Sequence, residues 1–357
     1  MVGSRLGPMW SQVALSVVLL VTAASPLRAQ ASPPAQEPPL RRWFEIQNVT
    51  VYSRYRFVES SADVTTSNQA QYKDTFRARF NIDSDKRYTV NVGYFSGNSF
   101  IGSWNNWGVG TGNFDGKDHY MKQLYASATP IRGLELQYGG LYVTRGENDE
   151  FTTYDDDGFL VGERASVRLP RTLYLDEISV TRGGLGPFSQ PNLASRWEGL
   201  AHPNYLQVLG AKRFNHVLAG SLDYSTQSGA DTVRVAITVK LDKIAPFSTL
   251  RYEQYRRVTN HPAAGFALWT EQAMSRHARL QWGYATIDQF YGGWNADRIQ
   301  SGRRFFGIAT IAIHGPLSAS LFATQALPSS YPITLKRRLD AVFLYDVLAS
   351  LRGTGIF

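Results

Sequence analysis

The sequence predicts an all-β protein whose strands close into an antiparallel barrel. Three observations lead to this prediction. Apolar and polar side chains alternate along many segments, tight and long connections alternate between those segments, and no apolar run is long enough for a membrane-spanning helix. Charged residues make up only 18% of the 357 residues, below the roughly one quarter usual in soluble domains.

The N-terminal segment, residues 1–31, is predicted to be a secretory signal peptide. Arg5 precedes an apolar run over residues 13–24, and small residues suited to cleavage follow it. The run is shorter than the roughly twenty residues that a spanning helix requires. Residues 32–42 are rich in proline and are expected to form a periplasmic linker, which leaves residues 43–357 for the barrel.

Alternation of side chains is clearest in residues 232–241, where every odd position from Val233 to Leu241 is apolar. Residues 73–80 and 161–169 follow the same period of two, which places successive side chains on opposite faces of a strand. To within about two to four residues at each end, the sequence predicts roughly sixteen strands. Their ranges are 44–58, 70–82, 87–98, 120–129, 133–145, 159–169, 173–182, 204–214, 216–226, 232–242, 247–257, 265–275, 278–288, 303–313, 317–326 and 336–357.

The connections between these strands fall into two alternating classes. One class is tight, as at residues 130–132 and 276–277, and the other is longer and richer in glycine, asparagine and aspartate. Soluble sandwiches have no reason to sort their connections, whereas transmembrane barrels carry short periplasmic turns and long external loops. An even strand count returns both termini to the periplasm. The long connections are 99–119, 146–158, 181–203 and 289–302.

The C-terminal segment 336–357 is predicted to be the last strand. Counting back by twos from Phe357 gives uncharged residues as far as Leu339, while the opposite face holds Arg338 and Asp340. This pattern resembles the Gram-negative outer-membrane β-barrel superfamily, and in size and topology the chain is similar to its sixteen-stranded porins. The resemblance implies that the barrel-insertion machinery reads the last strand and that the barrel is a monomer or a homotrimer.

If the apolar faces contact lipid, the opposite faces line a lumen. On the clearest strands these faces carry more basic than acidic side chains, the acids being Glu135, Asp223 and Glu253. A basic lumen concentrates anions and selects solutes by charge. The alternative for any single arginine is that it is paired or solvated. The predicted basic lumen residues are Lys73, Arg77, Arg79, Arg164, Arg168, Arg234, Lys240, Arg251 and Arg257.

The long connection 146–158 is acidic. Because the third external loop of porins folds into the lumen, the resemblance implies that this connection sets its acids across from the basic wall. A solvated external loop is the other interpretation. A Ca²⁺ site is less favoured, because the acids lack the alternating spacing of an EF-hand loop. The candidate constriction residues are Glu147, Asp149, Glu150, Asp155, Asp156 and Asp157.

Other chemistry finds little support in the sequence. The chain has no cysteine and its six histidines show no zinc-like spacing, so neither a metal nor a cofactor is predicted. No nucleotide-binding or nucleophile motif is present. The net charge of +8 is spread along strands instead of concentrated on a helix, which argues against nucleic acid as a partner. His119 beside Asp115 and Asp118 gives a less favoured alternative, an outer-membrane hydrolase.

The favoured prediction is a non-enzymatic, porin-like channel of the bacterial outer membrane. It would let small hydrophilic solutes diffuse passively and would weakly prefer anions. Outer-membrane lipid and small hydrophilic or anionic solutes are the expected partners. A second interpretation is a substrate-specific channel or exporter for an acidic polysaccharide, since the arginine-rich lumen resembles that of alginate-export barrels.

Overall fold

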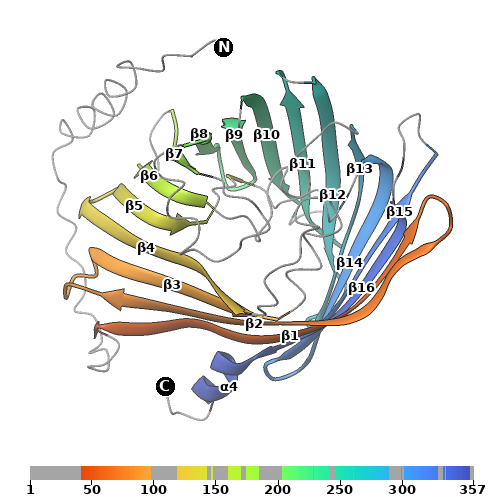
Figure 1. Cartoon of the computed structure of the whole chain (residues 1–357), viewed down its shortest axis with the longest axis horizontal. Coiled ribbons are helices and arrows are strands. Elements are labelled where there is room, and N and C mark those ends of the chain that lie inside the picture. Colours follow the sequence, from red (N-terminus) through yellow and green to blue (C-terminus); the bar gives the residue numbers. More distant parts are fainter. Residues whose placement is uncertain are drawn as a thin grey trace. The chain divides into compact units, whose positions relative to one another are not determined.

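Sixteen antiparallel strands close into one barrel, in which β1 pairs with β2 on one side and with β16 on the other (Figure 1). The computed structural model describes residues 42–97, 119–142, 146–147, 160–169, 174–184, 203–227, 229–241, 246–259, 261–288, 299, 301–328, 333 and 335–353. Every strand pairs with its neighbours in sequence, so the barrel is a simple up-and-down meander. The predicted all-β barrel is therefore confirmed.

The strand bounds lie within about four residues of the predicted segments, except that β2 begins five residues earlier and β16 ends eleven residues earlier. The strands are β1 (Phe44–Ser60), β2 (Thr65–Asn81), β3 (Tyr88–Ser96), β4 (His119–Ile131), β5 (Leu134–Leu141), β6 (Leu160–Arg168), β7 (Glu177–Gly184), β8 (Tyr205–Arg213), β9 (Leu218–Gln227), β10 (Ala230–Lys240), β11 (Phe247–Arg257), β12 (Ala263–Ala273), β13 (Ala278–Ile287), β14 (Gly302–His314), β15 (Leu317–Ala326) and β16 (Leu335–Asp346). Within the described residues, no helix is both long and apolar enough to cross a membrane.

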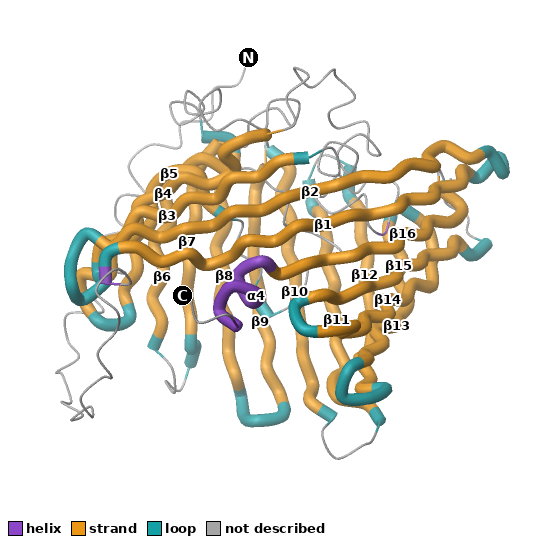
Figure 2. Tube along the Cα trace, turned by 90° about the horizontal axis from the view of Figure 1, so that it is seen from below, coloured by secondary structure: helices purple, strands orange, loops and turns teal. Residues whose placement is uncertain are grey.

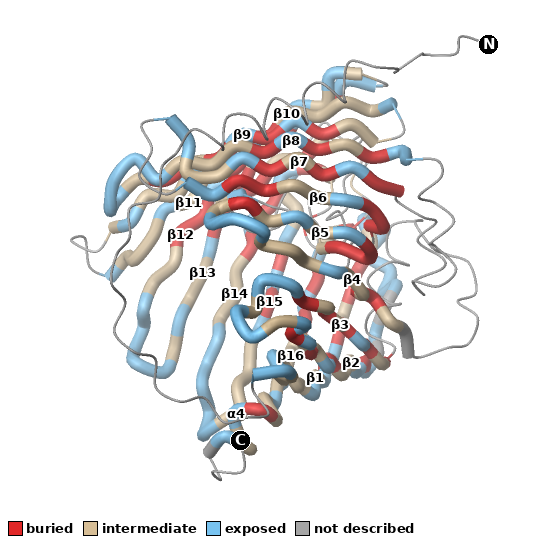
Figure 3. Tube along the Cα trace, turned by 90° about the vertical axis from the view of Figure 1, so that its left-hand side faces the viewer, coloured by how far each residue is buried: buried red, intermediate tan, exposed pale blue. Residues whose placement is uncertain are grey.

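Burial is inverted relative to a soluble protein. On β10, Val235 and Ile237 are 37% and 36% exposed, whereas Arg234 between β9 and β11 is 1% exposed. The same alternation runs along β7 and the first part of β8, as the colours of Figure 3 show. Large apolar side chains therefore cover the outer face, and polar side chains are enclosed on the inner face, as expected for a barrel surrounded by lipid.

A β-bulge near the start of β1 reverses which of its residues face inward. Ile46 pairs with Ala78 and Asn48 pairs with Arg77, so Gln47 is the extra residue of β1. A bulge inserts one residue into one strand and so reverses which side chains face inward beyond it. From Asn48 onward the even-numbered residues of β1 therefore face the inside of the barrel.

Four long connections emerge at the same end of the barrel. They span residues 97–118, 142–159, 185–204 and 288–301, and they alternate with tighter turns at the opposite end. The sorting has exceptions, because three connections at the end of the long ones are short. They are residues 61–64 between β1 and β2, 228–229 between β9 and β10, and 258–262 between β11 and β12. The β1–β2 hairpin instead gains length in its strands, which have 17 residues each (Figure 2).

The prediction of one strand over residues 336–357 is wrong in its second half. β16 ends at Asp346, and a short helix, α4 (Val347–Gly353), follows. The carboxylate of Asp346 accepts a hydrogen bond from the backbone N–H of Ala349 at 2.9 Å, which caps the helix and stops the strand. Leu348, only 4% exposed, belongs to this helix, which packs against β1 (Figures 1 and 2). Phe357 lies outside the described residues.

Candidate functional site

The inner face of the barrel gathers the predicted basic residues. All nine lie on the inward-facing positions of their strands: β2, β6, β10 and β11. These residues differ in how many acidic side chains lie beside them. Four groups of charged side chains lie along the inner wall, around Phe95, Arg168, Arg234 and Asp340.

The group around Phe95 is basic and aromatic. Lys73 Nζ, the Arg77 guanidinium and Lys122 Nζ lie 5.7, 5.6 and 5.1 Å from the centre of the Phe95 ring. Arg77 also lies 5.0 Å from the ring of Tyr142, at the start of the connection after β5. Cations near ring faces gain electrostatic stabilisation without losing their charge. Three positive side chains are thus held together on the β2–β4 wall.

The group around Arg168 is balanced by acids. Arg168 contacts Glu135 at 2.6 Å and Glu177 at 3.4 Å, across β5, β6 and β7. On the same strand, Arg164 donates from Nε to Thr181 at 2.9 Å and from a terminal nitrogen to Gln137 at 3.1 Å. A guanidinium that donates hydrogen bonds from several of its nitrogens is held in a fixed geometry. Arg164 therefore links β6 to β5 and β7 through its hydrogen bonds, and its charged group lies on the inner face.

Arg79 sits near the end of β2 where the turns are tight. Its Nε donates to Asn91 at 3.2 Å and its NH1 atom lies 3.8 Å from Glu45. Both side chains of this ion pair are more than a third exposed, so the pair adds little stability. Lys240, Arg251 and Arg257 lie on β10 and β11, between tight turns at one end and the long connections at the other.

Arg234 lies between two acids. Its NH1 atom contacts Asp223 on β9 at 2.7 Å, and its Nε contacts Glu253 on β11 at 3.0 Å. All three side chains are at most 1% exposed. One arginine with two carboxylates leaves a net charge of −1 when all three are ionised. Arg234 was predicted to make the lumen basic, but the two carboxylates beside it make this part of the inner wall negative.

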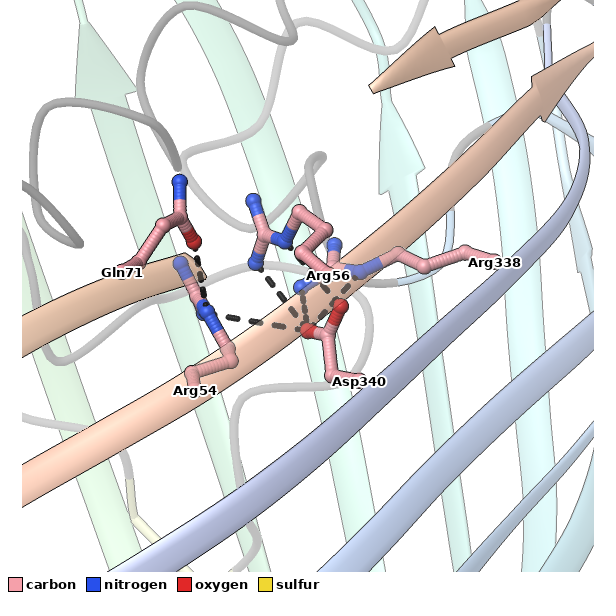
Figure 4. Close-up of polar contacts among 5 residues, drawn as sticks. All are labelled: Arg54, Arg56, Gln71, Arg338 and Asp340. Carbon is pink, nitrogen blue, oxygen red and sulfur yellow. Dashed lines mark hydrogen bonds and ion pairs between the residues drawn. The ribbon is translucent and has the colours of Figure 1, made fainter. Parts of the chain in front are cut away.

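Asp340 on β16 is surrounded by three arginines (Figure 4). Arg56 donates from Nε and NH2 at 3.0 and 3.1 Å, Arg338 donates from Nε at 3.1 Å, and Arg54 lies 3.7 Å away. Gln71 on β2 accepts from Arg54 Nε at 2.8 Å. All four charged side chains are at most 7% exposed, and their net charge is +2. This arginine-rich cluster is the largest departure from the predicted set of lumen residues.

The acidic connection after β5 reaches the inner wall. The backbone N–H of Glu147 donates to Ser221 Oγ on β9 at 3.0 Å, and Gly146 lies against Ser221 and Leu209. Burial raises the pKa of the Glu147 carboxyl, while Arg213 and Arg251 oppose that shift. The acidic side chain therefore lies near basic residues of β8 and β11. The other candidate constriction residues, Asp149, Glu150, Asp155, Asp156 and Asp157, lie outside the described residues.

The inner face also carries an apolar patch, which the sequence did not indicate. Tyr255, Trp269, Ile287, Phe306 and Phe322 are buried together on β11 to β15, and Ile299 of the connection before β14 packs with them. Glycines on the neighbouring strands make room for the rings. A Cβ on Gly283 would approach Trp269 Cβ to 2.5 Å, and one on Gly265 would meet the Tyr255 hydroxyl at 2.5 Å. The described part of the inner wall thus combines charged groups with this apolar sector and with a smaller apolar cluster of Leu141, Leu160 and Tyr205 on β5, β6 and β8.

Solved structures with the same architecture come from bacterial porins. OmpF of Salmonella typhi, solved in complex with daunomycin, superposes with a TM-score of 0.57 at 10% identity, covering 85% of this chain and 97% of that one. A variant of the Rh. blastica porin with five substitutions gives a TM-score of 0.55 at 10% identity, covering 85% and 100%. The fold is porin-like. No family model matches the sequence of this porin-like barrel, and neither does any curated protein.

Proposed function

We propose that this porin-like barrel is a passive channel of the bacterial outer membrane. Large exposed apolar side chains lie on the outer face all round the closed sheet, so lipid is its natural surrounding, and the enclosed inner face is polar enough to hold water. No covalent chemistry is required for such a channel, because it selects solutes by size and charge. The end with the four long connections would face outward, and both ends of the chain would face the periplasm.

We further propose that the channel prefers small hydrophilic anions. The supporting observation is the surplus of positive charge among the described residues of the wall formed by β16, β1, β2 and β4. There, Arg54, Arg56 and Arg338 outnumber Asp340, and Lys73, Arg77 and Lys122 share one aromatic ring. A low-dielectric wall focuses this positive potential into the lumen and raises the local concentration of anions.

The test is a measurement of single-channel conductance in planar bilayers, with the reversal potential taken in a salt gradient. The wild-type protein should give ohmic steps and a reversal potential that indicates anion preference. Charge reversal at Lys73 and Arg77 (Lys73→Glu with Arg77→Glu) changes the wall by four unit charges. It should lower the anion-to-cation permeability ratio by about eightfold, from Coulomb energies at about 10 Å in water with screening at 0.1 M salt.

A matched control is Arg256→Glu, which reverses a charge on the outer face of β11 and should leave the ratio unchanged. Equal ratios in the double variant and the wild type would refute the lumen assignment. Block of the wild-type current by micromolar acidic polysaccharide would instead favour the substrate-specific channel or exporter.

A further inference from the structure

A row of aromatic rings crosses the outer face of four neighbouring strands, β11 to β14. The ring centres of Tyr252 and Phe266 are 6.1 Å apart, those of Phe266 and Tyr284 are 5.9 Å apart, and those of Tyr284 and Phe305 are 5.6 Å apart. Each pair joins adjacent strands, so the row is continuous around this part of the barrel. Aromatic girdles of this kind mark the boundary between the hydrocarbon and the polar headgroups.

The side chains on either side of the aromatic row show which side faces the hydrocarbon and which side faces the headgroups. On β11, the outward residue one step toward the tight turns is Leu250, which is 37% exposed. One step toward the long connections, Gln254 accepts a hydrogen bond from the hydroxyl of Tyr252 at 2.9 Å. The ring of Tyr252 is thus flanked by an apolar residue on one side and directs its polar end to the other. The headgroup side of the boundary is the side of the long connections.

Two exposed arginines lie on that headgroup side. Arg256 is four residues beyond Tyr252 on β11, and Arg303 is two residues beyond Phe305 on β14, each on the same outer face as the aromatic residue. Neither has a carboxylate within 4.0 Å among the residues that the structure describes. This sets them apart from Arg337, another outward arginine near the same end, which contacts Glu59 at 2.9 Å.

The nearest outward acid on β10 is already engaged. Asp231 lies two residues beyond Val233, the cross-strand partner of Arg256, and its carboxylate accepts from the Tyr224 hydroxyl at 2.9 Å. Its backbone carbonyl accepts from the N–H of Val258 at 2.9 Å, which ties this end of β10 to β11. The arginine side chains therefore remain available to an anion in the headgroup layer.

We propose that Arg256 and Arg303 bind phosphate groups of the lipid in the outer leaflet, so that this sector of the barrel holds a phosphorylated lipid. The inference rests on the proposed outer-membrane location and orientation. Its physical basis is the position of two guanidinium groups, which suit phosphate as bidentate donors, just past an aromatic girdle. The girdle fixes their depth, and the exposed outer face gives lipid direct access.

The test uses the mature protein in detergent micelles, titrated with bis-phosphorylated lipid A and followed by native mass spectrometry. Arg256→Gln and Arg303→Gln should each weaken lipid A binding by about fivefold, and the double variant by about 25-fold, if each cation near a lipid headgroup contributes independently. The matched control is Arg276→Gln, which removes an exposed arginine from the turn between β12 and β13, at the other end of the same wall. It should bind lipid A as the wild type does.

The proposal is overturned if the double variant binds lipid A like the wild type, or if Arg276→Gln weakens binding as much. Retained binding in the charge-preserving double variant, Arg256→Lys with Arg303→Lys, to within about fivefold of the wild type would support it. Conductance separates this inference from the proposed function. The double glutamine variant should conduct normally, because both residues lie outside the lumen. A wild-type protein that binds lipid A through these arginines but does not conduct would refute the channel alone.

Discussion

Two buried clusters on the inner wall use the same residue types and reach opposite charges. On β9 to β11, Arg234 joins two carboxylates, whereas on β16 and β1 three arginines surround Asp340. Along β10 or β1 alone, each cluster shows only inward-facing arginine, Arg234 on β10 and Arg54 with Arg56 on β1. The difference arises from the acids on the neighbouring strands. The sign of the potential at a given point of the wall is therefore set by cross-strand pairing, and the content of one strand does not determine it.

The largest expected effect comes from removing Asp340, the acid that the described residues place among the three arginines. Asp340→Asn leaves three buried arginines without their shared carboxylate, and breaking a buried ion pair in this way costs about 3–5 kcal/mol. Urea unfolding of the protein in lipid vesicles, followed by tryptophan fluorescence, would measure the loss. Asp85→Asn is the control, since Asp85 is 61% exposed in the turn between β2 and β3 and should change the unfolding free energy by less than about 0.5 kcal/mol.

A combined variant sharpens this prediction. Adding Arg56→Met to Asp340→Asn removes one of the stranded cations and should recover part of the lost stability, because the remaining charge is smaller. An Asp340→Asn protein as stable as the wild type would show that the three arginines find other partners.

The second effect tests the acid-rich cluster. Arg234→Gln leaves Asp223 and Glu253 facing one another, which should cost about 3 kcal/mol. Adding Asp223→Asn to Arg234→Gln removes one of the two facing carboxylates, so it should recover part of this loss in the same unfolding measurement. Adding Asp223→Asn to Asp340→Asn should recover nothing, because Asp223 lies in the other cluster. Equal recovery in both backgrounds would contradict the difference between the clusters.

The smallest effect concerns Glu147, which lies near the acid-rich cluster around Arg234. Because burial raises the pKa of Glu147 above the ordinary value of 4.5, its carboxyl is neutralised at a higher pH than that of an exposed glutamate. Loss of this negative charge favours anions, so the anion-to-cation permeability ratio should rise by about twofold on acidification toward pH 5. Reversal potentials at several pH values would measure the change. In Glu147→Gln the ratio should already be high at pH 8 and should vary less with pH.

The sequence predicted the barrel well because lipid outside and water inside impose one simple period on every strand. It missed Arg54 and Arg56 because the bulge at Gln47 shifts the period within β1. The apolar sector was missed for another reason. In β12, both the inward residues, such as Trp269, and the outward ones, such as Leu268, are apolar, so the alternation is absent.

The end of the chain shows a further limit of pattern reading. From Leu339 to Tyr345 the alternation is that of an outer face, and the apolar residues beyond Asp346 continue it for several positions. The same residues also suit a short helix, since leucine and alanine are strong helix formers. The period of two is compatible with both a strand and a short helix here. The helix forms because Asp346 caps its N-terminus.

Helix α4 has a consequence for how the barrel avoids association with other chains. The last cross-strand pair between β1 and β16 joins Thr50 to Asp346, so residues 44–49 of β1 run on past the end of β16. An uncovered stretch of this kind offers free backbone groups to any passing extended peptide. Helix α4 packs against β1 and shields this part of its edge. Beyond Asp346, the junction between the first and last strands is therefore covered by a helix and not by a longer β16.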